Sequence, residues 1–412
     1  MKLAYNQNQD ITFKSRSLAA FLDHRVQLNK AVLDLSIDVP LVALANNSTE
    51  RKEKLRRVSI GWTLAFLTPL ITLPVTNRLA LKYIAKLVKS PISKENRLIR
   101  LSNKYLVNSN ETQKGIESLS KKYKTDFSEV IKNANGNYEK IRQKLINAKM
   151  SVLSFDYLFT ASSLGCIGFL NNRITKKKTR QDGFSAEFKM ADKDIIEKRA
   201  EKYKKTEPAR KAAFISVLAL LTASPLLVKK GLSTNAKNKF ADYIKKHASN
   251  FDYNDGLFMK RLPFFFVGIA SYLGMTMASR NQTELKDNIL RNSAYMGAYF
   301  GGDILIGSIL ANISDKLRKT NLLKDDYNKT LFNRIFPPTK PLKELSGKSK
   351  KTGSVLFWVN MVALGALAGF GVPYMINKMI KSDVSKDLKL KYTNKDFFEV
   401  NRKDAFKSFK LS

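Results

Sequence analysis

The chain has 412 residues and a formal charge of +38, from 73 Lys and Arg against 35 Asp and Glu, and 44% of its residues are hydrophobic. Its one cysteine and two histidines (Cys166, His24 and His247) cannot form an internal disulfide or a Cys/His zinc cluster within one chain. The hydrophobic fraction is too high for a disordered basic tail. A secreted disulfide scaffold, a zinc module and a disordered tail are therefore excluded.

Long stretches without charged residues are the main structural signal, because a bilayer core of ~30 Å needs about 20 mostly apolar helical residues. Residues 58–77 carry no charge over 20 positions, 262–279 over 18 and 352–377 over 26. Residues 292–314 contain a single charge, Asp303, in 23 positions. These four segments are predicted to span a membrane. Two shorter segments, 157–172 and 212–228, have 16 and 17 positions and fall short of a comfortable span.

The chain therefore divides into seven regions. In order, they are a polar or amphipathic N-terminal region (1–57), an apolar span (58–77), a basic helical region with the two short apolar segments (78–261), a transmembrane hairpin (262–314), a basic linker (315–351), an apolar span (352–377) and a basic C-terminal tail (378–412). Leu, Ile, Tyr and Phe are spaced among Lys and Glu between the apolar segments, which is typical of amphipathic helix.

The predicted fold class is accordingly all-α, a multi-pass helical membrane protein with basic amphipathic helices outside the bilayer. It is expected in a cell or cytoplasmic membrane. The alternative is a large soluble helical protein in which the apolar segments are buried core helices.

Small residues recur at helical spacing inside the apolar segments, where they allow close packing of helices in lipid. Gly297 and Gly301 form one GxxxG pair, and Gly365 and Gly369 form another. These faces could pack within the chain or against a second copy. Ala-Ser-x-Leu-Gly also occurs twice, at 161–165 and 270–274, each time with an Asn seven residues on. Chance and duplication explain this similarity equally well.

Asp303 is the sharpest single candidate for a functional residue. A carboxylate near the centre of a bilayer costs several kcal/mol unless it faces water, a partner or other helices. With Asn360 of the last apolar run, it could form an intramembrane polar site that holds a cation or relays a proton. Two other interpretations stay open. Gly301 and Gly302 could break the helix so that Asp303 caps a new one, or Asp303 could only join helices together.

Enzymatic activity is not expected, because the phosphate-loop, dinucleotide, zinc-protease and nucleophile-elbow motifs are all absent. No catalytic residue, cofactor or metal site is predicted. Cys166 lies among apolar residues and is expected to have a packing role.

The basic composition predicts a surface that attracts polyanions. Its densest candidate residues are Lys176, Lys177, Lys178, Arg180, Lys204 and Lys205. Anionic lipid headgroups are the expected partners if these residues flank inserted helices. Nucleic acid is a rival partner, although no nucleic-acid-binding motif is recognisable.

The predicted function is therefore a non-enzymatic, membrane-anchored interaction or scaffold protein. One alternative is a solute or ion transporter, or a channel-like protein, that uses Asp303. The other is a soluble helical protein that binds nucleic acid or anionic lipid surfaces.

Overall fold

A computed structural model describes residues 15–24, 26–88, 94–188, 190–234, 238–254, 258–324 and 334–393. These residues are nearly all helical, which confirms the predicted helical class. The helices are α1 (Ser15–His24), α2 (Val26–Ala43), α3 (Ser48–Ile84), α4 (Ser109–Tyr123), α5 (Ser128–Asn133), α6 (Tyr138–Gly165), α7 (Ile167–Thr179), α8 (Lys193–Lys204), α9 (Glu207–Ser233), α10 (Lys239–Lys246), α11 (Arg261–Met277), α12 (Gln282–Met296), α13 (Asp303–Arg318), α15 (Gly347–Ala366) and α16 (Val372–Thr393).

Short elements connect these helices. They are the 3₁₀ turns η1 (Lys94–Arg100), η2 (Asn103–Leu106), η3 (Ser185–Glu187), η4 (Ala248–Asn250) and η7 (Leu342–Glu344), the π-helical turns η5 (Gly297–Gly302) and η8 (Leu367–Gly371), and the two-residue strands β1 (Tyr253–Asn254) and β2 (Phe258–Met259). The two strands pair antiparallel, with Tyr253 opposite Met259. The π turns join α12 to α13 and α15 to α16, so each pair forms one long, nearly continuous helix.

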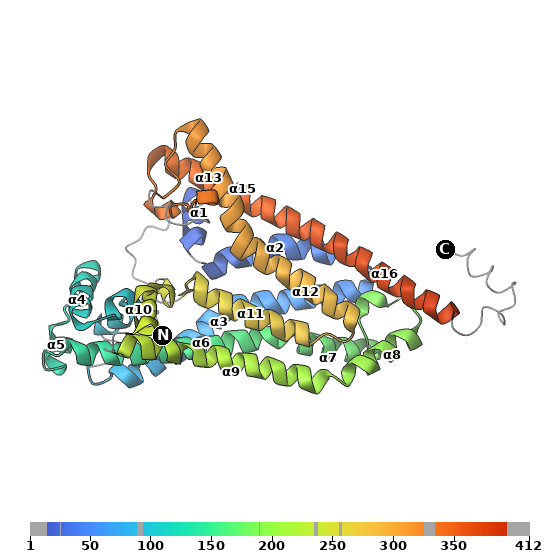
Figure 1. Cartoon of the computed structure of the whole chain (residues 1–412), viewed down its shortest axis with the longest axis horizontal. Helices are drawn as coiled ribbons and strands as arrows, with labels where there is room; N and C mark the ends of the chain where they lie inside the picture. Colours follow the sequence, from blue (N-terminus) through green and yellow to red (C-terminus); the bar gives the residue numbers. More distant parts are fainter. Residues whose placement is uncertain are drawn as a thin grey trace.

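The long helices form an elongated bundle. Helix α6 packs against α3, α9 and α11, and Figure 1 shows these helices running along the long axis of the molecule. Helices α4, α5 and α10 gather at one end, and α8 lies at the other. The core between the helices contains fully buried side chains such as Leu145 and Ile146 of α6 and Val267 of α11.

Asparagine starts several of these helices. In α3, α4, α6, α10 and α12 the side-chain oxygen of an Asn accepts a hydrogen bond from the backbone N–H three residues on, at Asn47, Asn108, Asn137, Asn238 and Asn281. Such a cap satisfies one of the four N–H groups that a helix start leaves without a partner. The abundance of Asn in the sequence therefore has a structural use.

Within the described ranges, four helical stretches are long and apolar enough to cross a membrane. They are Tyr138–Thr179, Glu207–Ser233, Gln282–Arg318 and Gly347–Lys386. The last two contain the predicted spans 292–314 and 352–377. The first two contain the segments 157–172 and 212–228, whose charge-free lengths were predicted to fall short of a comfortable span. They reach the length of a full span because each helical stretch continues beyond the charged residues that end its apolar run.

The other two predicted spans are also helical, but they differ in length or description. Residues 262–279 fall largely in α11, which has 17 residues and is shorter than the helices above. Residues 58–77 lie inside α3, which has 37 residues. The side chains of residues 65–70 and 73 lie outside the described part of the structure.

Glycines let helices of the bundle approach each other closely. A Cβ added at Gly274 of α11 would lie 2.7 Å from the Cα of Gly165 in α6. These are the matching glycines of the two Ala-Ser-x-Leu-Gly segments, so the similar segments pack against each other. A Cβ at Gly369 would lie 2.7 Å from the backbone oxygen of Ser36 in α2. The Gly365 and Gly369 face is therefore occupied within the chain.

We expect Gly369→Ala to destabilise the protein by about 1–3 kcal/mol, because the added methyl group meets the backbone of α2 and not a movable side chain. Gly301→Ala is the matched control, since no atom of another described residue lies within 4 Å of its added Cβ. Thermal unfolding in detergent measures both variants. Equal melting temperatures for the two variants would contradict the close packing of α2 on this glycine face.

Candidate functional site: a charged cavity inside the bundle

A cavity of about 160 Å³ lies between α2, α3, α6, α11 and α12. A cavity of about 150 Å³ is large enough to hold benzene. Charged side chains from four helices line it, at Lys30, Asp34 and Asp38 of α2, Lys54 and Arg57 of α3, Asp156 of α6 and Arg291 of α12. We call this space the central cavity. Its concave shape and convergent polar groups are typical of small-molecule sites.

Helix α2 contributes one side of the central cavity. Lys30 forms an ion pair with Asp34, one helical turn away. The Lys30 ammonium also lies 5.4 and 5.5 Å from the ring centroids of Tyr272 and Tyr295. The hydroxyl of Tyr295 donates a hydrogen bond to Asp38. Two aromatic rings thus lie within cation–π distance of Lys30, in addition to its ion pair with Asp34.

Helices α3 and α12 contribute the more basic side. Lys54 pairs with Glu50 at 2.5 Å, and Arg291 pairs with Asp287 at 2.5 Å. Arg57 differs, because it donates to neutral groups, the amide oxygen of Asn288 at 2.9 Å and the sulfur of Met275 at 3.3 Å. No carboxylate of the described residues lies within ion-pair distance of Arg57. Its guanidinium can therefore donate hydrogen bonds to an anionic group that enters the cavity.

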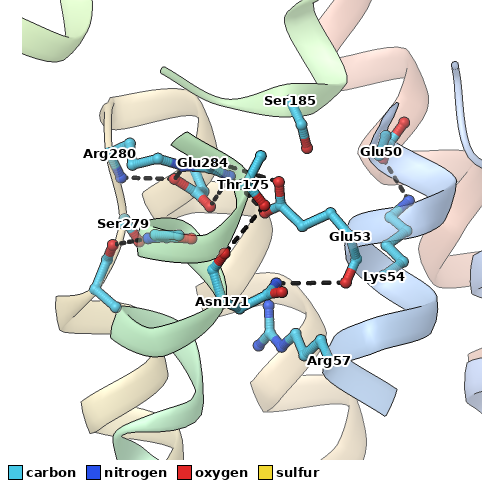
Figure 2. Close-up of polar contacts among 12 residues, drawn as sticks. Glu50, Glu53, Lys54, Arg57, Asn171, Thr175, Ser185, Ser279, Arg280 and Glu284 are labelled. Atoms are coloured by element: carbon cyan, nitrogen blue, oxygen red, sulfur yellow. Dashed lines mark hydrogen bonds and ion pairs between the residues drawn. The ribbon is translucent and has the colours of Figure 1, made fainter. Parts of the chain in front are cut away.

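An ion network at the start of α3 and α12 lies beside this basic side. Arg280 donates to Glu53 at 2.6 Å and to Glu284 at 2.8 and 2.9 Å, and Figure 2 shows both carboxylates gathered around it. The backbone N–H of Arg280 also donates to Glu284, at 2.6 Å. Since Glu53 belongs to α3 and Glu284 to α12, the three residues join two walls of the cavity. We call them the Arg280 network.

Helix α7 is tied to the same place. Arg56 donates to the side chains of Asn171 at 2.6 Å and Thr175 at 2.5 Å, and Asn171 donates to the backbone oxygen of Glu53 at 3.3 Å. Figure 2 shows Asn171 and Thr175 directed toward Glu53. The start of α3 is thereby held by α7 on one side and by the Arg280 network on the other.

The Arg280 network makes stability depend on pH. Burial alone would raise the pKa of Glu53, but Arg280 outweighs it and holds this pKa below its ordinary value. A lowered folded-state pKa stabilises the protein above the unfolded value of about 4.3, and this stability is lost as pH falls through the folded value. We expect the free energy of unfolding to begin to fall as pH drops below about 5 and to keep falling through the lowered folded-state pKa of Glu53.

The variant Glu53→Gln isolates this contribution. It should be less stable at neutral pH and should lose less stability than the unmodified protein on acidification. Chemical denaturation in detergent at several pH values measures both. Parallel curves for the two proteins would show that Glu53 does not carry the acid dependence.

Neither predicted intramembrane residue is placed at the central cavity. Asn360 lies away from it, and the side chain of Asp303 lies outside the described residues. Asp303 begins α13 directly after the π turn η5, and its side chain lies outside the described residues. Asn360 is buried in α15, and its amide nitrogen lies 3.8 Å from where a Cβ of Gly307 would be. Asn360 does not line the central cavity. The predicted pairing of Asp303 with Asn360 stays a prediction.

The predicted basic residues are exposed. Lys176, Lys177, Lys178 and Arg180 end α7, and Lys204 and Lys205 end α8, at the end of the bundle where α7 and α8 lie in Figure 1. Lys176 forms an ion pair with Asp182. Cys166, between α6 and α7, is also exposed, so the expectation of a packing role was wrong.

No group of three His, Cys, Asp or Glu side chains within the described ranges could hold a metal ion. The site is therefore a set of ion pairs around a cavity, with Arg57, Asp38 and Asp156 as the lining charges that have no oppositely charged partner among the described residues. No family model, no curated protein and no solved structure matches this chain.

Proposed function

We propose that this chain is a multi-pass integral membrane protein and that its central cavity binds a small polar solute, as in a transporter or channel-like protein. The observation that carries the proposal is the inverted distribution of side chains. Charged groups are gathered inside the bundle, while apolar side chains cover the outside of the helices that are long enough to span.

The apolar helices present most of their surface outward. Only 28% of the apolar stretch of α9 is buried, and only 18% of that in Gln282–Arg318. Exposed large apolar side chains on these and neighbouring spans include Ile215, Leu220, Leu226 and Leu227 of α9, Ile309 and Ile313 of α13, and Val355, Val359 and Val362 of α15. Soluble monomers seldom expose contiguous apolar surface on this scale. Contact with lipid removes the free-energy cost of exposing these apolar side chains to water.

The interior supports solute binding. Ions buried in protein cost several kcal/mol each unless they are paired, and charges within spanning segments usually face a polar path. Several buried atoms at the central cavity have no hydrogen-bond partner within the described part of the chain. They are Asp34 Oδ1, Asp156 Oδ1, Arg291 Nε and Asn292 Oδ1. Water or a polar solute in the cavity would satisfy them.

Membrane insertion is tested by washing membranes with alkaline carbonate, which strips proteins held by charge. We expect the chain to stay in the pellet and to need detergent for release. Release by carbonate alone would contradict insertion and would favour a soluble helical protein on anionic surfaces.

Access to the central cavity is tested with a cysteine at Ser271, which is 2% exposed and lines it. The exposed Cys166 is first replaced by Ala. A small cationic methanethiosulfonate should react with Ser271→Cys but not with Ser308→Cys, an equally buried position outside the lining. If both cysteines resist the reagent, polar solutes do not enter and the binding proposal fails.

The basic end of the bundle supports a second candidate, a membrane-anchored scaffold that holds anionic lipid or an acidic partner. Replacing Lys176, Lys177, Lys178 and Arg180 by Gln should then reduce the phosphatidylserine that copurifies in mild detergent, relative to phosphatidylcholine. Ser271→Cys reactivity should be unchanged. An unaltered lipid ratio would contradict this candidate.

A further inference from the structure

A second, smaller cavity of about 50 Å³ lies farther along the bundle. Its polar lining includes Thr76 and Asn77 of α3, Arg100, Lys149 of α6, Asp252 and Tyr253. Thr72 of α3 and Asp156 of α6 line both this cavity and the central cavity. The two cavities therefore meet at Thr72 and Asp156, and together they follow α3 from Lys54 to Asn77.

Asp156 has an unusual environment for a buried carboxylate. It is 7% exposed, and one carboxylate oxygen accepts a hydrogen bond of 2.6 Å from the hydroxyl of Tyr253. The other oxygen, Oδ1, has no hydrogen-bond partner among the residues that the structure describes. No Lys or Arg of the described residues lies within ion-pair distance of Asp156. The sequence places it at the edge of an apolar segment, whereas the fold places it at the junction of two cavities.

Most other buried carboxylates in the bundle have a cation beside them. Asp252 pairs with Lys149, Asp287 with Arg291, Glu53 with Arg280 and Glu187 with Arg199. Asp252 lines the same second cavity as Asp156, yet it has a cation beside it. A carboxylate without a protein cation, next to space that solutes can fill, is suited to a cation from solution.

Side chains that carry hydroxyl oxygens line the central cavity together with Asp156. The hydroxyl-bearing side chains of Thr72 and Thr160 are buried and line the central cavity with Asp156, and Thr160 lies one helical turn after it in α6. Hydroxyl and carboxylate oxygens are the ligands that hard metal cations prefer. A monovalent cation would also neutralise a charge that is costly within a membrane-spanning segment.

We propose that Asp156 binds an alkali-metal cation at the junction of the two cavities, which serve as its routes of entry and exit. The proposal rests on the proposed function and deepens it, because it names a cation that the pathway binds. The hydrogen bond from Tyr253 then holds the carboxylate in place from the side of the second cavity.

A carbodiimide tests the proposal, since dicyclohexylcarbodiimide modifies protonated carboxyl groups in apolar surroundings. The purified full chain in detergent is treated at mildly acidic pH, in NaCl, KCl or N-methylglucamine chloride of equal ionic strength. Peptide mass mapping gives the rate at Asp156. We expect Na⁺ or K⁺ to slow modification by about tenfold when its concentration is ten times the dissociation constant, while N-methylglucamine does not.

Asp252 is the negative control, because its pairing with Lys149 keeps the carboxyl group ionised, so it should stay unmodified in all three salts. Tyr253→Phe keeps the carboxylate of Asp156 and should preserve protection with an altered salt midpoint. Modification at Asp156 that no alkali cation slows would overturn the proposal. So would the absence of any modification there in the N-methylglucamine salt, because the carboxyl group would then be closed to solution.

These failures are separable from failure of the proposed function. Suppose that Ser271→Cys still reacts and the chain resists carbonate, but no alkali cation slows modification of Asp156. Only the proposal of a cation site then fails. Loss of Ser271→Cys reactivity contradicts solute entry itself.

Discussion

Replacing Arg280 by Met should destabilise the protein by about 3–5 kcal/mol, one of the two largest effects that we expect. Arg280 is the cation between Glu53 and Glu284, and all three side chains are largely buried, with 14%, 9% and 6% exposed. Removing the guanidinium leaves two carboxylates close together without the cation that joins them. Burial lowers the pKa of Arg280, but these two carboxylates raise it more, so the charged form is the one that the fold stabilises.

Denaturant unfolding in detergent measures the loss, and an exposed ion pair supplies the control. Lys193 and Glu197 are 3.7 Å apart with 58% and 43% of their side chains exposed, so Lys193→Met should cost no more than about 1 kcal/mol. Adding Glu53→Gln and Glu284→Gln to Arg280→Met should restore part of the stability, since the buried negative charges are gone. Equal effects of Arg280→Met and Lys193→Met would contradict the buried network.

The helical class and the long apolar helices could be predicted from the sequence, because both depend on local composition. The charge-free count underestimated α9, whose apolar run of 17 residues lies inside a helix of 27. Lys and Arg at the ends of a helix can extend along it toward water, so a charge does not mark where a spanning helix ends.

The starts of several helices can also be predicted from the sequence. Asn followed by Glu three residues later occurs at Asn47, Asn108 and Asn281, each the start of a helix. This spacing lets the Asn side chain cap the helix and puts a carboxylate at its positive end.

The candidate site was predictable only in part. Opposite charges four residues apart at Lys30 and Asp34, or at Asp287 and Arg291, indicate pairing along a helix but not burial. Burial follows from packing between distant helices, as in the contact of Glu53 with Arg280, which are 227 residues apart. Asp303 stands out in the sequence because it lies inside an apolar run. Asp156 does not stand out, because it directly precedes such a run.

Lys149→Met is the second change with a large expected effect, a loss of about 3–5 kcal/mol. Lys149 and Asp252 are 2.8 Å apart, and each side chain is only 5% exposed. Burial would raise the pKa of Asp252, but Lys149 lowers it below its ordinary value, so the carboxylate is charged in the folded protein. The substitution leaves that charge buried without its cation, although the backbone N–H groups of Asn103 and Tyr253 still donate to it, each at 3.0 Å.

The double variant Lys149→Met/Asp252→Asn shows whether the unpaired charge causes the loss. Asn keeps a side-chain oxygen for the backbone N–H groups but carries no charge, so the double variant should be more stable than Lys149→Met alone. Unfolding of both variants in denaturant gives the comparison. Equal stability would mean that the lost packing of the Lys149 side chain accounts for the effect. The pairing of Lys149 with Asp252 holds the start of β1 against α6. It therefore also positions Tyr253, whose hydroxyl donates to Asp156 between the two cavities.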